Sequence, residues 1–229
     1  MSGHSAWTYF PYKGFWFGLD LLFPPSCAGC GKSGARWCED CQKALIPVPY
    51  PICDICGNPQ KNEGICPACL TSRPLFYSLR SWSVFKGPLR GAIHRLKYRR
   101  DIGLGDTLST HLVPFMKSLN WTVDLVVPVP LSRKRYKERG YNQIALVARP
   151  FSTQMGLMYS SRVLVRKKHT LSQVGLSALA RKKNVEGAFW ADANLIKGKL
   201  ILMMDDVATT GSTLAAAASA LVDSGASRV

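Results

Sequence analysis

Uninterrupted apolar runs at two places in the chain predict strands that are buried on both faces. The first reads VDLVVPVP over residues 123–130, and the second reads LILMM over residues 200–204. Runs of this kind are typical of parallel sheets, in which helices cover both faces of each strand. Two shorter runs, at residues 81–85 and 162–166, are interpreted as further strands.

Apolar residues at helical spacing predict the helices between these strands. Leu89, Ile93 and Leu96 follow Pro88 and predict a helix over residues 88–98. Its exposed face is expected to carry Arg90, His94, Arg95 and Lys97. The same criterion predicts three more helices. The first covers residues 101–119, the second runs from the end of the basic loop 131–143 to about residue 149, and the third covers the alanine-rich residues 214–223. Strands that alternate with helices predict an α/β fold, here a doubly wound parallel sheet.

The chain divides into three parts by composition. Residues 1–26 form an aromatic N-terminal segment, residues 27–72 hold all the cysteines, and residues 79–229 form the α/β domain. The aromatic segment does not fit a signal peptide, because Asp20 interrupts its apolar run and no small-residue cleavage site follows. A short helix is expected over residues 14–23. No stretch is long enough to span a bilayer, so we expect a cytoplasmic protein without a transmembrane segment.

All eight cysteines fall into four C-x-x-C pairs. In a cytosolic chain this spacing is typical of metal binding, since two pairs complete a tetrahedral Cys₄ site. We therefore predict structural zinc in a double zinc ribbon over residues 27–72, with an iron–sulfur cluster or redox-active thiols as alternatives. The proposed ligands are Cys27, Cys30, Cys38, Cys41, Cys53, Cys56, Cys66 and Cys69.

Two pairings of these knuckles are possible. Sequential pairing gives two separate ribbons, whereas crossed pairing gives one interleaved domain. The short gaps within each half and the proline-rich break at residues 47–51 favour sequential pairing. A segment this small has almost no apolar core, so metal binding would supply its folding free energy.

Positive charge is concentrated in the α/β domain. The formal net charge of the chain is +16, and residues 79–229 hold twenty-four Lys and Arg against nine Asp and Glu. An excess of this size favours a polyanionic partner, such as nucleic acid, a phosphorylated ligand or an acidic membrane. A solubility feature is the alternative interpretation.

The run at residues 200–214, LILMMDDVATTGSTL, places chemistry at the end of a buried strand. A strand, a small-residue turn and a helix N-terminus direct backbone N–H groups at one point, which suits a phosphate. The adjacent carboxylates of Asp205 and Asp206 would repel a phosphate, so they are expected to face sugar hydroxyls or Mg²⁺. An ordinary strand–helix turn that carries two aspartates is the alternative.

This stretch resembles the phosphoribosyl-diphosphate motif of type I phosphoribosyltransferases. The resemblance implies that Asp205 and Asp206 are the catalytic acids that hold the ribose hydroxyls, and that Mg²⁺ accompanies the substrate. It also implies that the 5′-phosphate is bound by Ala208, Thr209, Thr210, Gly211, Ser212 and Thr213.

Two basic segments are expected to meet the diphosphate. Residues 131–143 follow the strand at 123–130, and the resemblance implies that their loop contacts the leaving group through Arg133, Lys134 and Arg135. The segment after residue 166 corresponds to a hood loop that closes over the diphosphate and excludes water. Its ligand-facing members would be Lys167, Lys168, Thr170 and Gln173. A solvated basic loop is the alternative for this second segment.

Most of the chain resembles the ComF/GntX family, which joins a cysteine zinc ribbon to a phosphoribosyltransferase domain. The resemblance rests on LDLLFPPSC, LKYRRD, VVPVPLSRKRYKERGYNQ, HTLSQVGLSALARKKNVEGAF and the acid-pair motif, in that order. At the end of the chain, Gly225 is expected to cap the last helix and Val229 to begin another strand, so a C-terminal strand would be missing.

The resemblance implies a role in natural transformation. The chain is then expected to bind phosphoribosyl diphosphate and to handle single-stranded DNA on its basic face, with DNA-uptake proteins as partners. Aromatic residues that could stack bases are Trp82, Tyr98, Tyr136 and Tyr141. The alternative function is an active phosphoribosyltransferase that uses a nucleobase or related acceptor. The sequence contains no recognisable pocket for such a base.

Overall fold

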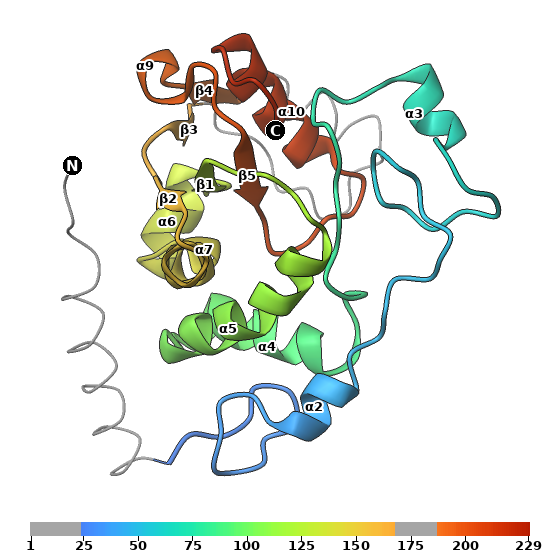
Figure 1. The fold of residues 1–229 in the computed structure, drawn as a ribbon. Coiled ribbons are helices and arrows are strands. Elements are labelled where there is room, and N and C mark those ends of the chain that lie inside the picture. Colours follow the sequence, from blue (N-terminus) through green and yellow to red (C-terminus); the bar gives the residue numbers. More distant parts are fainter. Residues whose placement is uncertain (1–23, 168–186) are drawn as a thin grey trace.

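A three-stranded parallel sheet lies at the centre of the α/β domain (Figure 1). The structure is a computed structural model and describes residues 24–167 and 187–229. The sheet has the order β2-β1-β5, with β2 at Met158–Tyr159, β1 at Leu125–Pro128 and β5 at Ile201–Met204. β1 pairs with β5 from Leu125 opposite Ile201 to Pro128 opposite Met204. The carboxyl ends of both strands therefore meet at one edge of the sheet.

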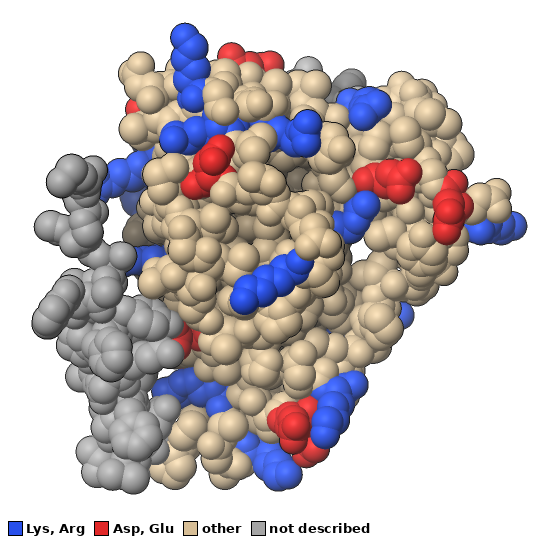
Figure 2. Space-filling view, viewed as in Figure 1, with Lys and Arg blue, Asp and Glu red and all other residues tan. Residues whose placement is uncertain are grey.

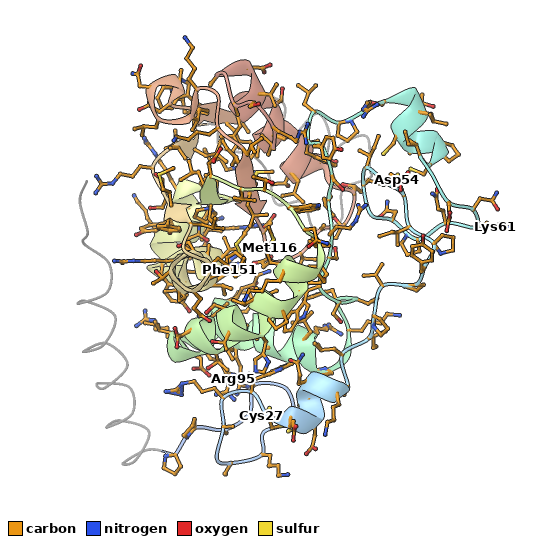
Figure 3. All side chains as sticks on the ribbon, in the orientation of Figure 1. Cys27, Asp54, Lys61, Arg95, Met116 and Phe151 are labelled. Atoms are coloured by element: carbon orange, nitrogen blue, oxygen red, sulfur yellow. The ribbon has the colours of Figure 1, made fainter. Side chains whose placement is uncertain are left out.

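Helices cover both faces of this sheet, as the apolar runs predict. Leu125 and Val127 belong to a core cluster with Leu214 and Leu221 of α10 (Ser212–Asp223). Val126, which points the other way, packs with the residues labelled Met116 and Phe151 in Figure 3. These residues belong to α5 (Gly103–Ser118) and α7 (Gln143–Met155). The doubly wound α/β arrangement is thus confirmed.

The helix predicted over residues 88–98 is α4 (Gly87–Tyr98), and the one predicted over residues 101–119 is α5. Two other local predictions are wrong. Residues 131–143 are not a loop, because Arg133–Arg139 form α6, which Ser132 caps by accepting the N–H of Arg135. Residues 81–85 are not a strand, because Ser83 Oγ and the N–H of Val84 both bond to the carbonyl of Ile46.

A second, two-stranded sheet was not anticipated from the sequence. β3 (Leu164–Arg166) pairs antiparallel with β4 (Phe189–Ala191), and a short helix, α9 (Ala193–Ile196), follows. β3 and β4 pack against α10. The helix expected over residues 14–23 lies outside the described residues.

β5 is an outer strand of the sheet, and no further named strand pairs with its outer edge among the described residues. There Leu200 forms a parallel bridge with Arg228, at the position where a further strand is expected. A cavity of about 980 Å³ runs along this edge between β5, α5 and residues 76–85. No helix in the two described parts of the chain is long and apolar enough to cross a membrane.

Candidate functional site: two cysteine clusters and an acidic pair

The cysteines form two clusters built on the same local pattern. In the first ribbon, the N–H of Cys27 bonds to Lys32 O and the N–H of Gly31 bonds to Cys27 O. In the second, the N–H of Cys53 bonds to Asn58 O and the N–H of Gly57 bonds to Cys53 O. Each ribbon ends in a short helix that begins just after its third cysteine: α2 (Glu39–Lys43) and α3 (Pro67–Thr71). The segment is therefore a tandem repeat of one unit.

Sulfur positions in both clusters fit a tetrahedral metal. One set is Cys27, Cys30, Cys38 and Cys41, the other is Cys53, Cys56, Cys66 and Cys69, and within each set all four Sγ atoms lie within 4.8 Å of one another. The Sγ–Sγ distance is 3.5 Å for Cys27–Cys41, 3.6 Å for Cys30–Cys38 and 3.7 Å for Cys56–Cys66. Zinc–sulfur bonds of about 2.3 Å give a tetrahedral edge of about 3.8 Å. The clusters fit structural zinc and confirm the sequential pairing.

Backbone donors prepare the first thiol of each ribbon as a metal ligand. Burial raises the pKa of the Cys27 thiol, but N–H groups of Cys30 and Cys38 outweigh it and lower that pKa to about 6. Burial also raises the pKa of the Cys53 thiol. Hydrogen bonds from the backbone N–H groups of Cys66 and Cys56 outweigh that effect and lower the pKa to about 6. The thiolate is the form that binds metal, so these hydrogen bonds favour metal binding at neutral pH.

Asp205 and Asp206 lie directly after the last residue of β5, at the carboxyl edge of the sheet. The backbone N–H of Asp206 donates to Asp205 Oδ1 at 2.8 Å, which fixes the Asp205 carboxylate against the backbone of Asp206. Burial and the adjacent carboxylate of Asp206 raise the pKa of Asp205 to about 7, although the charges of Lys97 and Arg166 act in the opposite direction. Two carboxylates held this close favour a ligand that supplies hydroxyl donors or positive charge.

Asp206 is held by residues from two other helices. Lys97 Nζ, in the last turn of α4, donates to Asp206 Oδ1 at 2.8 Å, and Gln143 Nε2, at the start of α7, donates to Oδ2. Gln143 Oε1 in turn accepts a 2.6 Å hydrogen bond from Arg139. The Lys97 and Asp206 side chains are only 18% and 9% exposed, so solvent screens this ion pair weakly.

The prediction that α4 exposes Arg95 and Lys97 is therefore wrong. Both side chains turn inward, because each finds a carboxylate: Arg95 binds Asp101 at 2.7 Å, and Lys97 binds Asp206. The sequence assigned no role to Lys97 or Gln143. Lys97 lies in the segment LKYRRD and Gln143 in the segment GYNQ, and both segments carry the family resemblance. That resemblance was the signal that could have pointed to these two residues.

The turn after the acid pair leads into the N-terminus of α10. Gly211 is the N-cap with φ of +71°, a left-handed conformation that glycine adopts without strain, and it has no side chain with which to cap the helix. The N–H of Ser212 donates to Thr210 Oγ1 at 3.5 Å. Ala208, Thr209 and Thr210 are exposed, and Thr210 Oγ1 lies 2.8 Å from Ser212 Oγ. Backbone N–H groups and hydroxyls therefore gather beside the carboxylates, as a phosphate cradle requires.

The structure describes some of the candidate diphosphate-binding residues and not others. Arg133 and Lys134 are exposed on α6, whereas Arg135 is half-buried. Burial lowers the pKa of Arg166, Arg135 lowers it further and Asp205 opposes both effects, so Arg166 lies within electrostatic reach of Arg135 and the acid pair. Lys167 Nζ lies over the Trp190 ring at 4.6 Å. Lys168, Thr170 and Gln173 lie outside the described residues.

The four aromatic candidates separate into two groups. Trp82 is half-buried and packs against the cluster around Cys27 and Leu96. Tyr141 is half-buried and donates to Leu96 O at 2.7 Å. Tyr98 and Tyr136, in contrast, are 62% and 54% exposed. Only the second pair offers rings to a ligand without rearrangement.

Charge on the visible face does not form a single patch. Figure 2 shows basic side chains dispersed over this face, with acidic side chains beside several of them. Two of the acid–base contacts, Lys32–Asp40 and Lys43–Glu39, lie on the exposed first ribbon. The net charge alone therefore does not locate a polyanion site.

The structure thus defines an α/β protein with a parallel sheet and two Cys₄ ribbons. The double zinc ribbon domain family matches residues 18–70. DNA utilization protein YhgH of Escherichia coli (strain K12) is 32% identical over 91% of this chain and 96% of its own length. Competence protein F of Haemophilus influenzae is 32% identical (77% and 80%), and competence protein ComFC of Bacillus subtilis is 27% identical (85% and 81%).

The chain belongs to the family of these proteins, the ComF family. Among solved structures, a glutamine phosphoribosylpyrophosphate amidotransferase from B. subtilis, complexed with ADP and GMP, aligns with a TM-score of 0.37 and 19% identity. That alignment covers 54% of this chain and 24% of the other. We draw no inference from a likeness at that level.

Proposed function

We propose that the chain binds phosphoribosyl diphosphate with Mg²⁺ at the acid pair and that it acts in DNA uptake, where it handles single-stranded DNA. The observation that carries the first part is the arrangement after β5. Two adjacent carboxylates stand next to a small-residue turn and the N-terminus of α10, whose N-cap, Gly211, has no side chain to cap it. This combination suits a ligand that carries both hydroxyls and a phosphate.

Each group has a chemical task in this proposal. Asp205 and Asp206 accept hydrogen bonds from the ribose hydroxyls, and residues 208–213 donate to the 5′-phosphate. Arg133, Lys134 and Arg135, together with the hood segment that includes Lys167, Lys168 and Gln173, neutralise the diphosphate. Such a site works by positioning and electrostatic stabilisation, without a covalent protein intermediate.

The donor set suits Mg²⁺ that arrives with the substrate. Mg²⁺ takes carboxylate and phosphate oxygens and keeps several waters. Both Asp206 oxygens already accept hydrogen bonds, from Lys97 and Gln143, and Asp205 Oδ1 accepts one from the backbone. The acid pair therefore offers few oxygens to a resident ion but can face a cation that the diphosphate carries.

The DNA-uptake part is supported by the relatives and by charge. Proteins named for competence and DNA utilization match most of the chain. The net charge of +16 favours a polyanion. Proteins of the DNA-uptake machinery are the expected partners.

Calorimetric titration of phosphoribosyl diphosphate into zinc-loaded protein with excess Mg²⁺ tests the first part. The Asp205→Asn/Asp206→Asn double variant should lose at least about tenfold in affinity, because it loses two charge-assisted interactions. Asp223→Asn, at the opposite end of α10, is the control and should bind normally. Unchanged affinity of a folded double variant would overturn the assignment.

Diphosphate release across a panel of nucleobases then separates binding from turnover. A transferase forms a bond from the acceptor to the anomeric carbon while the bond to the diphosphate oxygen breaks. Base-dependent release that the double variant lacks would make the chain an active phosphoribosyltransferase. Binding without release would leave a sensor or scaffold in DNA handling.

A further inference from the structure

The outer face of α4 carries a straight row of basic and aromatic side chains. Arg90, His94 and Tyr98 are four positions apart, so they lie one above another on the helix, and all three are exposed. The His94 and Tyr98 rings are 4.8 Å apart between centroids and tilted by 49°. Arg139, from the end of α6, lies over the Tyr98 ring at 5.1 Å from its centroid. The row therefore places two adjacent rings between two arginines.

A concave surface lies alongside this row, where α4 meets the first ribbon. The cavity there has a volume of about 380 Å³ and is lined by Arg90, His94, Arg95 and Arg99, with Cys27 and Ala28 from the ribbon and three glycines. None of the described residues that line it is acidic. The glycines, Gly31, Gly87 and Gly91, leave backbone close to the surface. This is an electropositive groove whose floor a sugar–phosphate chain can approach.

We propose that the row Arg90–His94–Tyr98, with Arg99 and Arg139, is the track on which the chain binds single-stranded DNA. Bases stack on the exposed Tyr98 ring, and the arginines neutralise phosphates. Unpaired bases are required, because in a duplex the base faces are already stacked. The inference rests on the proposed DNA handling and assigns it to one helix face.

The track leads to the acid pair. Arg139 contacts the Tyr98 ring and also donates to Gln143 Oε1 at 2.6 Å, and Gln143 donates to Asp206. Lys97, next to Tyr98 in α4, binds the same carboxylate. DNA on this track therefore lies beside the helix turn that holds Asp206, and Arg139 connects the track with the residues around the acid pair.

Fluorescence anisotropy with a labelled oligo-dT, compared with a duplex of equal length, tests the track. Tyr98→Ala should weaken binding at least about fivefold, whereas Tyr98→Phe, which keeps the ring, should bind as the natural protein does. Arg90→Gln should reduce the slope of log affinity against log salt by about 0.7, the value for one lost single-strand phosphate contact. The natural protein should prefer the single strand.

Matched controls remove the same groups elsewhere. Arg149→Gln takes an exposed arginine from α7, and Tyr77→Ala takes an exposed ring from the segment after α3. Both should bind oligo-dT normally. Tyr98→Ala and Arg90→Gln are exposed-site changes, and retained zinc content with an unchanged circular dichroism spectrum shows that they fold.

Three results would count against the proposal in different ways. Failure of the natural protein to bind oligo-dT would refute the DNA handling on which the track rests. Normal oligo-dT binding that Tyr98→Ala and Arg90→Gln reduce no more than the controls would overturn the track alone. Equal affinity for duplex and single strand would overturn the role of stacking.

Discussion

The two zinc ribbons are built alike but are packed against different parts of the molecule. Cys27 and Cys41 of the first ribbon belong to one core cluster with Ala92 and Leu96 of α4. The buried cysteines of the second ribbon instead belong to the core cluster that contains Phe76 and residues of β1 and α10. Figure 1 shows α2 and α3, one from each ribbon, on different sides of the molecule.

Because the two ribbons contact different elements, the loss of each ribbon should affect a different part of the molecule. The first ribbon supports α4, and α4 supplies both Lys97 to the acid pair and the outer row of the proposed DNA track. The second ribbon is anchored to the connecting segment 76–80, where the N–H of Leu79 bonds to Ile55 O. We infer that the first ribbon supports the candidate site from the side of α4, while the second packs on the side of β1 and α10.

The largest expected effect comes from removing one zinc ligand in each ribbon. Cys41→Ser should release the first ribbon and expose the inner face of α4, whereas Cys69→Ser should unfold residues 52–72 and leave α4 protected. Structural zinc contributes on the order of 10 kcal/mol to small domains, so either loss is severe locally. Hydrogen–deuterium exchange of the α4 peptides measures the difference.

Zinc content distinguishes local from general damage. Each variant should retain about one zinc per chain, and a chelator should remove both from the natural protein and unfold both ribbons. Equal loss of α4 protection in Cys41→Ser and Cys69→Ser would refute the separate roles. An unchanged spectrum after complete chelation would contradict structural zinc itself.

Local sequence patterns predicted these regions well where the residues of a site lie close together in the sequence. The C-x-x-C spacing predicted both cysteine clusters, because each cluster forms within fifteen or so residues. The run of five apolar residues predicted β5 and placed Asp205 and Asp206 at its end. The partners of Asp206 could not be read in this way, since Lys97 lies 109 positions away in the sequence.

The wrong local predictions have physical causes too. Residues 131–143 look like a basic loop because of their charge, yet Ser132 at the N-terminus and Gly140, with φ of +80°, enclose a helix between them. Their periodic apolar signal is absent because α6 buries no residue. The strand predicted over residues 162–166 contains β3, but β4 and its pairing with β3 were missed, because a strand of three residues carries too few positions for a period.

A smaller effect is expected where glycine permits each ribbon to dock. A Cβ at Gly91 of α4 would lie 2.8 Å from Ala28 O, and a Cβ at Gly57 would lie 2.5 Å from Leu79 O. Both Gly→Ala variants should lose about 1–3 kcal/mol in urea unfolding. For Gly91 the sign is diagnostic, because alanine inside a helix otherwise stabilises by about 1 kcal/mol.

Gly31 supplies the control for Gly57. It occupies the same place in the first ribbon and has φ of +82°, but a Cβ there would meet nothing within 4 Å. Gly31→Ala therefore measures backbone strain alone, and Gly57→Ala should cost more by the docking contact. Equal losses would show that the second ribbon does not depend on its contact with Leu79. Reduced exchange protection in α4 should appear for Gly91→Ala only.

The smallest effect is expected from the two arginines that hold the ribbons. Arg95 donates to Ser26 O at 2.9 Å and binds Asp101 at 2.7 Å, where the two side chains are 22% and 11% exposed; in Figure 3 it lies near Cys27. Arg80 donates only to carbonyls, among them Asp54 O at 3.1 Å. Hydrogen bonds between charged groups contribute more than those to neutral ones. Arg95→Gln should therefore lower the free energy of unfolding by about 1–2 kcal/mol, and Arg80→Gln by about half as much.

A double-mutant cycle separates the ion pair from the backbone contact. Asp101→Asn in the Arg95→Gln background should add little, giving a coupling energy of about 1 kcal/mol, because the partner charge is already gone. Independent, additive losses would mean that the pair does not fasten the first ribbon. In that case the buried contact of Cys27 and Cys41 with Ala92 and Leu96 would carry the attachment, and the contrast between the ribbons would rest on packing alone.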